Sequence, residues 1–183
     1  MYGISKDLAV NESNYFDGGI HSDVTIEKIA YENSKKDGTG KYVLAFHFKG
    51  SKGETFRHVE WPVEANDANA DSKISNMSKR IKHILTKFVP EENVIVNNVE
   101  TFEQYANEII RIAGKSYEGK TFAIKLTYGD VKNPSANLGF TKYVGFIAND
   151  ASTLKISNTE CITKPTPSTA ADQANIAAVT DAF

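Results

Sequence analysis

The sequence has a single cysteine, no long hydrophobic run and no excess of charge of one sign. Cys161 alone cannot form an internal disulfide or a thiolate metal cluster. No apolar run reaches the roughly 18 residues of a membrane-spanning helix, and the first residues lack the basic and apolar stretches of a secretion signal. With 21 basic against 23 acidic residues, no overall positive field attracts a polyanion. We therefore expect a cytoplasmic protein with no membrane partner.

The composition is that of an ordinary globular domain. The 183 residues are 40% hydrophobic and 24% charged, which excludes collagen-like, coiled-coil and fully disordered chains. Residues 1–20 are polar and form a lead-in segment, and residues 21–149 hold the regular patterns. Residues 150–183 are expected to form a linker, rich in Pro, Thr and Ser over residues 163–169, and a flexible C-terminal tail.

Alternating patterns predict three strands in the first third of the chain. In the first, the apolar positions change face between Ile26 and Ile29, as in a strand that carries a bulge or a strong bend. Residues 41–49 alternate with period two, and residues 54–63 return after a glycine-containing turn. Pro62 lacks a donor for the ladder, so the returning strand should end or lie at an edge there.

The middle of the chain has helical periodicity. Apolar residues recur at spacings of three and four over residues 74–88, and Pro90 ends this pattern. Thr101 and Gln104 resemble a capping box that begins a second amphipathic helix, which runs as far as Gly114. Two helices are therefore expected.

Two more strands are expected after the helices. Residues 120–128 alternate with period two, residues 129–137 have the composition of a loop, and residues 138–147 form the last strand. Three strands, two helices and two strands predict a mainly β protein of the α+β class. This order is typical of a five-stranded, partly open barrel of the oligonucleotide-binding (OB) type with two helices after its third strand.

The sequence contains no recognisable catalytic constellation. The four histidines, His21, His47, His58 and His83, are scattered and have no carboxylate at the spacing of a metal site. The segment Gly38-Thr39-Gly40-Lys41 superficially resembles a phosphate-binding loop. However, the first glycine of that motif is missing and no apolar strand precedes the segment, so we reject this interpretation. We therefore expect a protein that is not an enzyme, with no metal and no cofactor.

Basic and aromatic residues occur together on the expected strands. Cations can follow the phosphates of a single nucleic-acid strand while aromatic rings stack on its bases, each stack being worth about 1–3 kcal/mol. The lysines and the arginine of this set would neutralise phosphates, and its aromatic rings would stack on any base. The candidate nucleic-acid-binding residues are Lys49, Lys52, Phe56, Arg57, His58, Trp61, Lys125, Tyr128, Lys142 and Tyr143.

Three segments carry a resemblance to a known family. They are the hairpin of residues 42–48 and 54–63, the helix end at residues 84–88, and residues 117–125, where a Gly-Lys pair leads into an alternating strand. With them the chain resembles, over about residues 22–147, the small single-stranded-DNA-binding proteins of bacteriophages. The resemblance implies an OB fold and binding of single-stranded DNA with little base specificity, during replication or recombination.

The C-terminal tail extends this resemblance. Proteins of this class commonly end in a flexible linker and an acidic tip with a terminal aromatic residue, which recruits replication partners. Asp181 and Phe183 match one acid and the final aromatic residue, so they are the candidate partner-binding residues.

A structural or adaptor protein, such as a virion component, is the alternative interpretation. The charges of residues 1–149 cancel and the whole net charge of -2 lies in residues 150–183, so the expected barrel is neutral. A DNA-binding protein should gather its cations and aromatic rings in one exposed groove. An adaptor should expose an apolar patch and disperse the cations.

Overall fold

A computed structural model describes residues 15–97, 99–141 and 145–165 of the chain. These residues form a mainly β structure with two α-helices, as the sequence predicts. The strands are β1 (Gly19–Asn33), β2 (Tyr42–Lys49), β3 (Thr55–Glu60), β4 (Phe122–Asp130), β5 (Asn133–Phe140) and β6 (Ile147–Ala148), and the helices are α1 (Ala70–Leu85) and α2 (Phe102–Ala113). No helix in the described ranges has the length and apolar character needed to cross a membrane.

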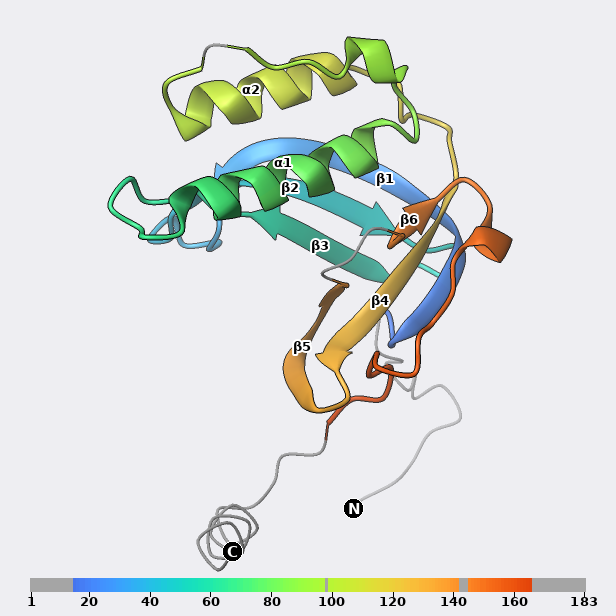
Figure 1. Ribbon diagram of the computed structural model, residues 1–183. Helices are drawn as coiled ribbons and strands as arrows, with labels where there is room; N and C mark the ends of the chain where they lie inside the picture. The colour runs from blue at the N-terminus through green and yellow to red at the C-terminus, as the bar shows by residue number, and fades with distance from the viewer. Residues whose placement is uncertain (1–14, 98, 142–144, 166–183) are drawn as a thin grey trace, which may run out of the picture.

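The strands form one antiparallel sheet in the order β3-β2-β1-β4-β5, with β6 also paired to β4 (Figure 1). β1 belongs to both parts of this sheet, because its first residues pair with β4 and its later residues pair with β2. Asp23, with φ 57°, lies in the register shift between His21 and Val24 of the β4 pairing, and the β2 pairing shifts register between Ile26 and Lys28. The predicted bulge is confirmed, and it lets one strand bend from β4 to β2.

The expected closure of the sheet into a five-stranded barrel is not found in the described residues. β3 and β5 are the two edge strands, and they meet through side chains instead of a ladder. The ring of Phe140 lies 5.1 Å from that of Phe56 and 4.9 Å from that of His58. Tyr15 makes an isolated bridge to Thr55, so the lead-in segment meets the edge of β3 at the position where a closing strand would begin.

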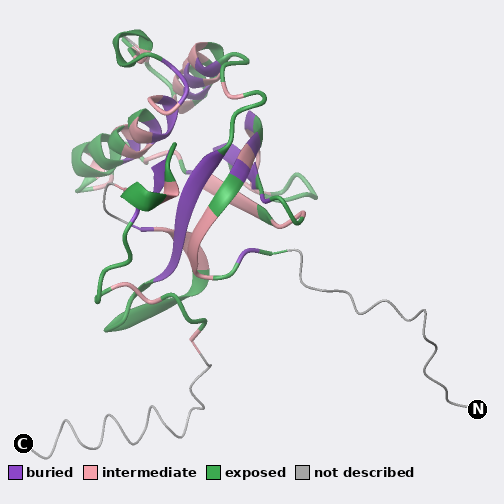
Figure 2. Cartoon of the chain, turned by 90° about the vertical axis from the view of Figure 1, so that its right-hand side faces the viewer, coloured by how far each residue is buried: buried purple, intermediate pink, exposed green. Residues whose placement is uncertain are grey.

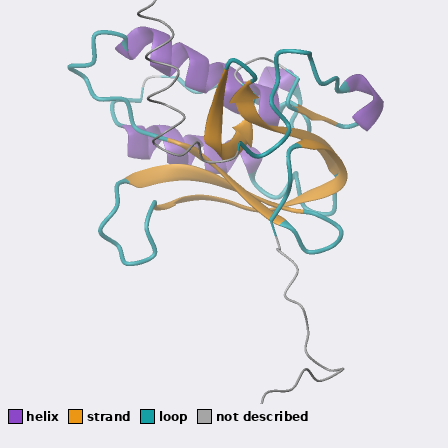
Figure 3. Cartoon of the chain, turned by 90° about the horizontal axis from the view of Figure 1, so that it is seen from below, coloured by secondary structure: helices purple, strands orange, loops and turns teal. Residues whose placement is uncertain are grey.

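The two helices pack their apolar residues against the sheet at one end of the molecule (Figure 1). Buried residues concentrate in the strands and on the inner sides of the helices (Figure 2). Viewed from below, the strands bend around this core (Figure 3). The predicted capping box of α2 is confirmed, with the Thr101 side chain accepting from the backbone of Gln104, and the helix ends at Gly114, where φ is 50°.

The end of the sheet differs from the sequence-based expectation. β4 continues to Asp130 and β5 begins at Asn133, so the loop predicted over residues 129–137 is mostly a strand pair. Pro134 lies within β5, where an exposed edge strand tolerates the missing backbone donor. The last predicted strand is divided, because β5 ends at Phe140 and β6 is a separate short strand.

Part of the expected linker and tail packs against β4. The backbone N–H of Tyr128 donates to the carbonyl of Cys161, and the N–H of Cys161 donates to that of Gly129. Leu154 is buried in the same segment, beside β6. Residues 150–162 therefore extend the folded body beyond the boundary expected at residue 149, and Asp181 and Phe183 lie outside the described residues.

Candidate nucleic-acid interface

A groove of about 770 Å³ lies beside β3, bounded by the loop that joins β1 to β2 and by the hairpin of β4 and β5. We call it the β3 groove. Its lining includes five phenylalanine or tyrosine residues, three lysine or arginine residues and two acids, together with smaller side chains of β5. These residues are Tyr15, Phe16, Phe48, Phe56 and Tyr128; Lys36, Arg57 and Lys164; and Asp17 and Glu27.

A second groove of about 500 Å³ lies where β3 ends against α1, and we call it the Trp61 groove. Trp61 is 49% exposed, and Pro62, Val63 and Met77 provide apolar lining beside it. The first half of β3, residues 55–57, lines the β3 groove, and the second half, residues 58–60, lines the Trp61 groove. The two grooves thus follow one another along the length of β3.

The predicted cations do not all gather in one groove. Arg57 lines the β3 groove. Lys49 lies at the end of β2 and forms an ion pair with Glu27, with 3.0 Å between Nζ and Oε1. Lys52 is exposed in the turn between β2 and β3. Lys142 and Tyr143 fall outside the described residues.

The prediction that Lys125 contacts phosphate is wrong, because this lysine is buried. Its Nζ atom lies 2.7 Å from Oε1 of Glu160 and donates to the carbonyl of Lys155. Both side chains of the ion pair are less than a tenth exposed. The charge of Lys125 therefore fastens residues 155–160 to β4 and has no access to a ligand.

The predicted aromatic residues differ in what they can contact. Trp61 is open to solvent, whereas Tyr128 is only 6% exposed at the wall of the β3 groove. Phe56 is half-buried and stacks on Phe48 with ring centroids 6.0 Å apart. His58 is only 14% exposed at the wall of the Trp61 groove, where its Nε2 lies 3.0 Å from Oε1 of Glu60. Among these four, Trp61 is the most exposed ring and Phe56 is partly exposed, so these two rings are the ones that a base can reach most readily.

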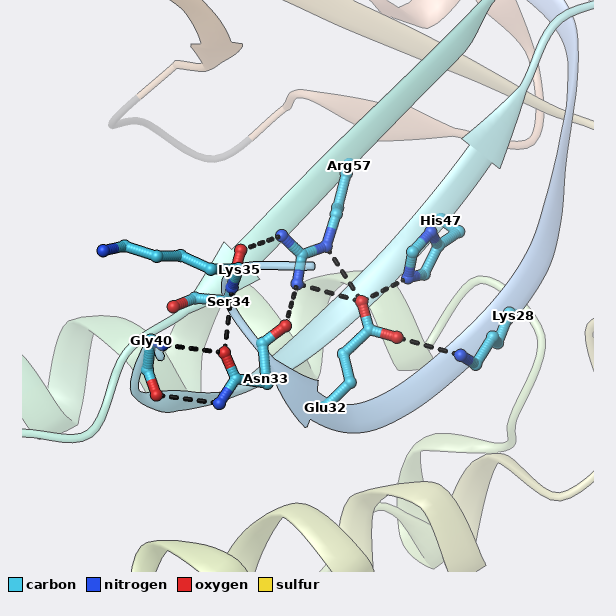
Figure 4. A network of polar contacts seen from close by, with 8 residues as sticks. All are labelled: Lys28, Glu32, Asn33, Ser34, Lys35, Gly40, His47 and Arg57. Atoms are coloured by element: carbon cyan, nitrogen blue, oxygen red, sulfur yellow. Dashed lines mark hydrogen bonds and ion pairs between the residues drawn. The ribbon is translucent and has the colours of Figure 1, made fainter. Parts of the chain in front are cut away.

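Arg57 belongs to a polar cluster on the outer face of β1, β2 and β3 (Figure 4). Its Nε and Nη2 atoms each lie 2.9 Å from Oε1 of Glu32. His47 donates to the same oxygen from 2.8 Å, and Lys28 donates to Oε2 from 2.9 Å. Burial alone would raise the pKa of Glu32, but the hydrogen bonds from Lys28 and His47 outweigh it and lower the pKa from 4.5 to about 2. The carboxylate is therefore ionised at neutral pH.

The β1–β2 loop, residues 34–41, is built on the side chain of Asn33. Its Oδ1 atom accepts from the backbone N–H groups of Lys35 and Gly40, and its Nδ2 atom donates to the carbonyls of Gly38 and Gly40. Position 40 has no room for a side chain, since a Cβ there would lie 2.1 Å from Oγ of Ser34. The loop therefore has a defined shape beside the groove.

Among the lining residues that the sequence analysis missed are an exposed ring and two exposed cations: Tyr15, Lys36 and Lys164. Lys36 occurs in the β1–β2 loop, where two adjacent lysines, Lys35 and Lys36, could have indicated a site for an anion. Tyr15 and Lys164 lie in segments read as lead-in and linker, and nothing in the local pattern places them beside β3.

Comparisons with protein-family models, curated proteins and solved structures found no match to this chain. In the described part of the chain, no three His, Cys, Asp or Glu side chains lie close enough together to hold a metal ion. The fold and the grooves define a class: a mainly β protein with an open antiparallel sheet and a groove, lined by cations and aromatic rings, beside an edge strand.

Proposed function

We propose that this protein binds single-stranded DNA without base specificity, in the β3 groove and onward to Trp61. The observation that carries the proposal is the lining of the β3 groove, in which Lys36, Arg57 and Lys164 occur with Tyr15 and Phe56. Cations and exposed ring faces are the two components that hold a single strand. The role in replication or recombination follows from the resemblance to phage single-stranded-DNA-binding proteins.

The order of the strands supports an OB-type architecture. An OB barrel has β1 between β2 and β4, with β3 and β5 at the two ends that close on each other. The present sheet has the order β3-β2-β1-β4-β5, and the helices are inserted between β3 and β4. We interpret the sheet as an OB-type barrel left open between β3 and β5. OB folds bind oligonucleotides on the face of the second and third strands, between the loop after the first strand and the loop after the fourth.

The charges of the β3 groove predict moderate affinity and clear salt dependence. Asp17 and Glu27 line it beside the cations, so its field is weaker than that of a purely basic channel. If two or three phosphates are neutralised, log K should fall with log salt with a slope of about -1.4 to -2 for a single strand. Duplex DNA is wider and stiffer than one strand, so it should bind more weakly.

The proposal is tested by titrating the protein into fluorescein-labelled oligo-dT and into a duplex of equal length, over a series of salt concentrations. Saturable binding that prefers the single strand and weakens with salt supports the proposal. Because Trp61 is the single tryptophan, quenching of its fluorescence reports whether the bound strand reaches the Trp61 groove.

Two matched variants strengthen this experiment. Lys36→Gln removes a cation of the β3 groove and should weaken binding about fivefold, the loss of one phosphate contact. Lys115→Gln removes an exposed lysine that follows α2, away from the groove, and should leave binding unchanged. Equal effects of the two substitutions would contradict a defined site.

A structural or adaptor role is the second candidate function. It is favoured by the dispersal of the predicted cations, since Lys49 is paired with Glu27 and is not part of the groove lining, and Lys125 is buried. If neither fluorescence nor gel shift detects oligo-dT binding at micromolar protein, the DNA-binding proposal fails and the adaptor role replaces it.

A further inference from the structure

We propose that Arg57 is a positioning residue: its guanidinium holds the β1–β2 loop so that Lys36, and not Arg57 itself, meets a phosphate in the β3 groove. This inference rests on the proposed function and assigns the roles of two residues within that site. It is carried by the hydrogen bonds of the guanidinium and by the contrasting lack of ion pairs between Lys36 and any other described residue.

The donors of Arg57 are almost fully used within the protein. An arginine side chain has five N–H groups. Nε donates to Oε1 of Glu32, Nη1 donates to the carbonyl of Ser34 at 3.3 Å, and Nη2 forms an ion pair with the same Oε1 and donates to the carbonyl of Asn33 at 3.4 Å. The carboxylate of Glu32 neutralises most of the charge. Little remains of Arg57 for a phosphate, either as hydrogen-bond donor or as cation.

These contacts join β3 to the first residues of the β1–β2 loop. Asn33 is the last residue of β1, and Ser34 is the first residue of the loop. The two carbonyls are therefore fixed from the edge strand β3, across β2, at the point where the chain leaves the sheet (Figure 4). A planar guanidinium can hold a carboxylate and two carbonyls at once, whereas the ammonium of a lysine is a compact point charge.

The guanidinium is itself oriented by its surroundings. Glu32 is held from its other side by His47 of β2 and by Lys28 of β1. The Arg57 side chain is one-third exposed, and the Glu32 side chain is 23% exposed. Side chains from three adjacent strands thus fix the direction in which Arg57 meets the loop.

Lys36 has the properties that a phosphate contact needs. It lies on the β1–β2 loop and lines the β3 groove. Within the described residues it is exposed and forms no ion pair, unlike Lys41 of the same loop, which pairs with Glu64. Its charge is available to a ligand, provided that the loop keeps its position.

The test compares oligo-dT affinity and its salt dependence for the wild type, Arg57→Lys, Lys36→Gln and the double variant. Arg57→Lys keeps the charge and removes the fork of donors. We expect it to weaken binding about fivefold, as Lys36→Gln does, and to reduce the salt slope by about 0.7, the contribution of one phosphate. We expect the double variant to bind no more weakly than either single variant, because both changes remove the same contact.

The control is Arg111→Lys. Arg111 of α2 also donates from Nε and Nη2 to a single carboxylate oxygen, that of Glu108, but it lies away from the groove. This variant should bind oligo-dT as the wild type does. Hydrogen exchange gives a second measurement: in Arg57→Lys the amides of Ser34, Gly38 and Gly40 should exchange at least about tenfold faster, with those of β4 unchanged.

Glu32→Ala provides an independent test with opposite expectations. It removes a negative charge near the groove, so electrostatics alone would tighten DNA binding. The positioning role predicts weaker binding, because Arg57 loses the anchor that orients it. This variant keeps the inference testable if Arg57→Lys fails to fold.

The outcomes separate this inference from the proposed function. If Arg57→Lys binds like the wild type, or if its effect adds to that of Lys36→Gln, Arg57 has no positioning role and the inference is overturned while DNA binding stands. Tighter binding by Glu32→Ala also overturns it. If the wild type does not bind oligo-dT, both the proposed function and this inference fall.

Discussion

Glu32 and Glu60 receive the same kinds of donor in two different surroundings. Each carboxylate is contacted by Nε and Nη2 of one arginine and by Nε2 of one histidine. The Glu60 side chain is 4% exposed, between β3 and α1, whereas that of Glu32 is 23% exposed on the outer face of the sheet. One set of contacts joins two core elements, and the other sets the position of a loop.

The two arginines that contact these carboxylates also differ in geometry. Arg80 makes a fork, with Nε 2.7 Å from Oε1 and Nη2 2.6 Å from Oε2 of Glu60. Arg57 places both of these atoms on one oxygen of Glu32 and reaches backbone carbonyls with the rest. A buried carboxylate must be paired because an unpaired charge in the interior is costly, whereas a partly exposed pair adds little to stability. Substitutions at Glu60 and its partners should therefore lower the stability of the fold more than substitutions at Glu32 and its partners.

The largest effect is expected from Arg80→Ala. It leaves the Glu60 carboxylate buried without its main partner, which should lower the free energy of unfolding by about 3–5 kcal/mol. Urea denaturation followed by circular dichroism measures the change. Arg111→Ala, which removes an exposed pair on α2, should leave it nearly unchanged. Similar values for the two variants would contradict the importance of the buried fork.

Lys125→Met should have the next largest effect. The Lys125–Glu160 pair is buried like that of Glu60, but it fastens an irregular segment, as Glu32 does. If burial decides the effect, unfolding should be easier by about 2–4 kcal/mol. The same urea experiment measures it. A loss under about 1 kcal/mol would show that the type of element, and not burial, distinguishes the clusters.

Arg57→Ala should change stability by about 1 kcal/mol or less, because its ion pair is partly exposed to solvent. The same variant should lose affinity for oligo-dT, since the β1–β2 loop is no longer held. Comparing its urea midpoint with its binding curve shows whether the two properties separate. A loss of stability as large as that of Arg80→Ala would show that the contacts of Glu32 stabilise the fold as much as the buried contacts of Glu60 do.

The acid dependence of stability gives the smallest signal. The pKa of Glu32 is lowered from 4.5 to about 2, so its ion pairs contribute fully above pH 4.5 and are lost as the pH falls toward 2. Glu32→Gln should flatten the decrease of stability over this range. Burial alone would raise the pKa of Glu60, but hydrogen bonds from Arg80 and His58 outweigh it and lower the pKa, so Glu60→Gln should also flatten the curve. Thermal melts between pH 2 and 7 measure both; an unchanged slope would refute the role of these carboxylates.

Local signals predicted local structure. The change of face between Ile26 and Ile29 marked the bulge of β1, and Thr101 with Gln104 marked the start of α2. Both features depend on residues within a few positions of one another. The alternation of residues 41–49 and 54–63 likewise identified the β2–β3 hairpin.

Features that depend on distant contacts were not predictable from local patterns. Lys125 alternates with apolar neighbours as a solvated residue does, yet residues 150–162 cover that side of β4 and bury it. Arg57 can pair with Glu32 only because β2 places β3 two strands away from β1 in the sheet. No pattern in the residues around either position predicts this arrangement. The strand pair at Asp130 and Asn133 was hidden by Pro134, which the exposed edge tolerates.

The bend of β1 has a consequence for the order in which the protein folds. The later part of β1 pairs with β2, a neighbour in sequence, but Gly19 pairs with Leu126, about a hundred residues further on, and such non-local pairings form slowly. We expect the β1–β2–β3 meander to form first and to wait for β4. Pulse-labelling hydrogen exchange should then protect the amides of β2 before those of β4; simultaneous protection would contradict this order. On a ribosome, the first residues of β1 would stay unpaired until nearly the whole domain had been synthesised.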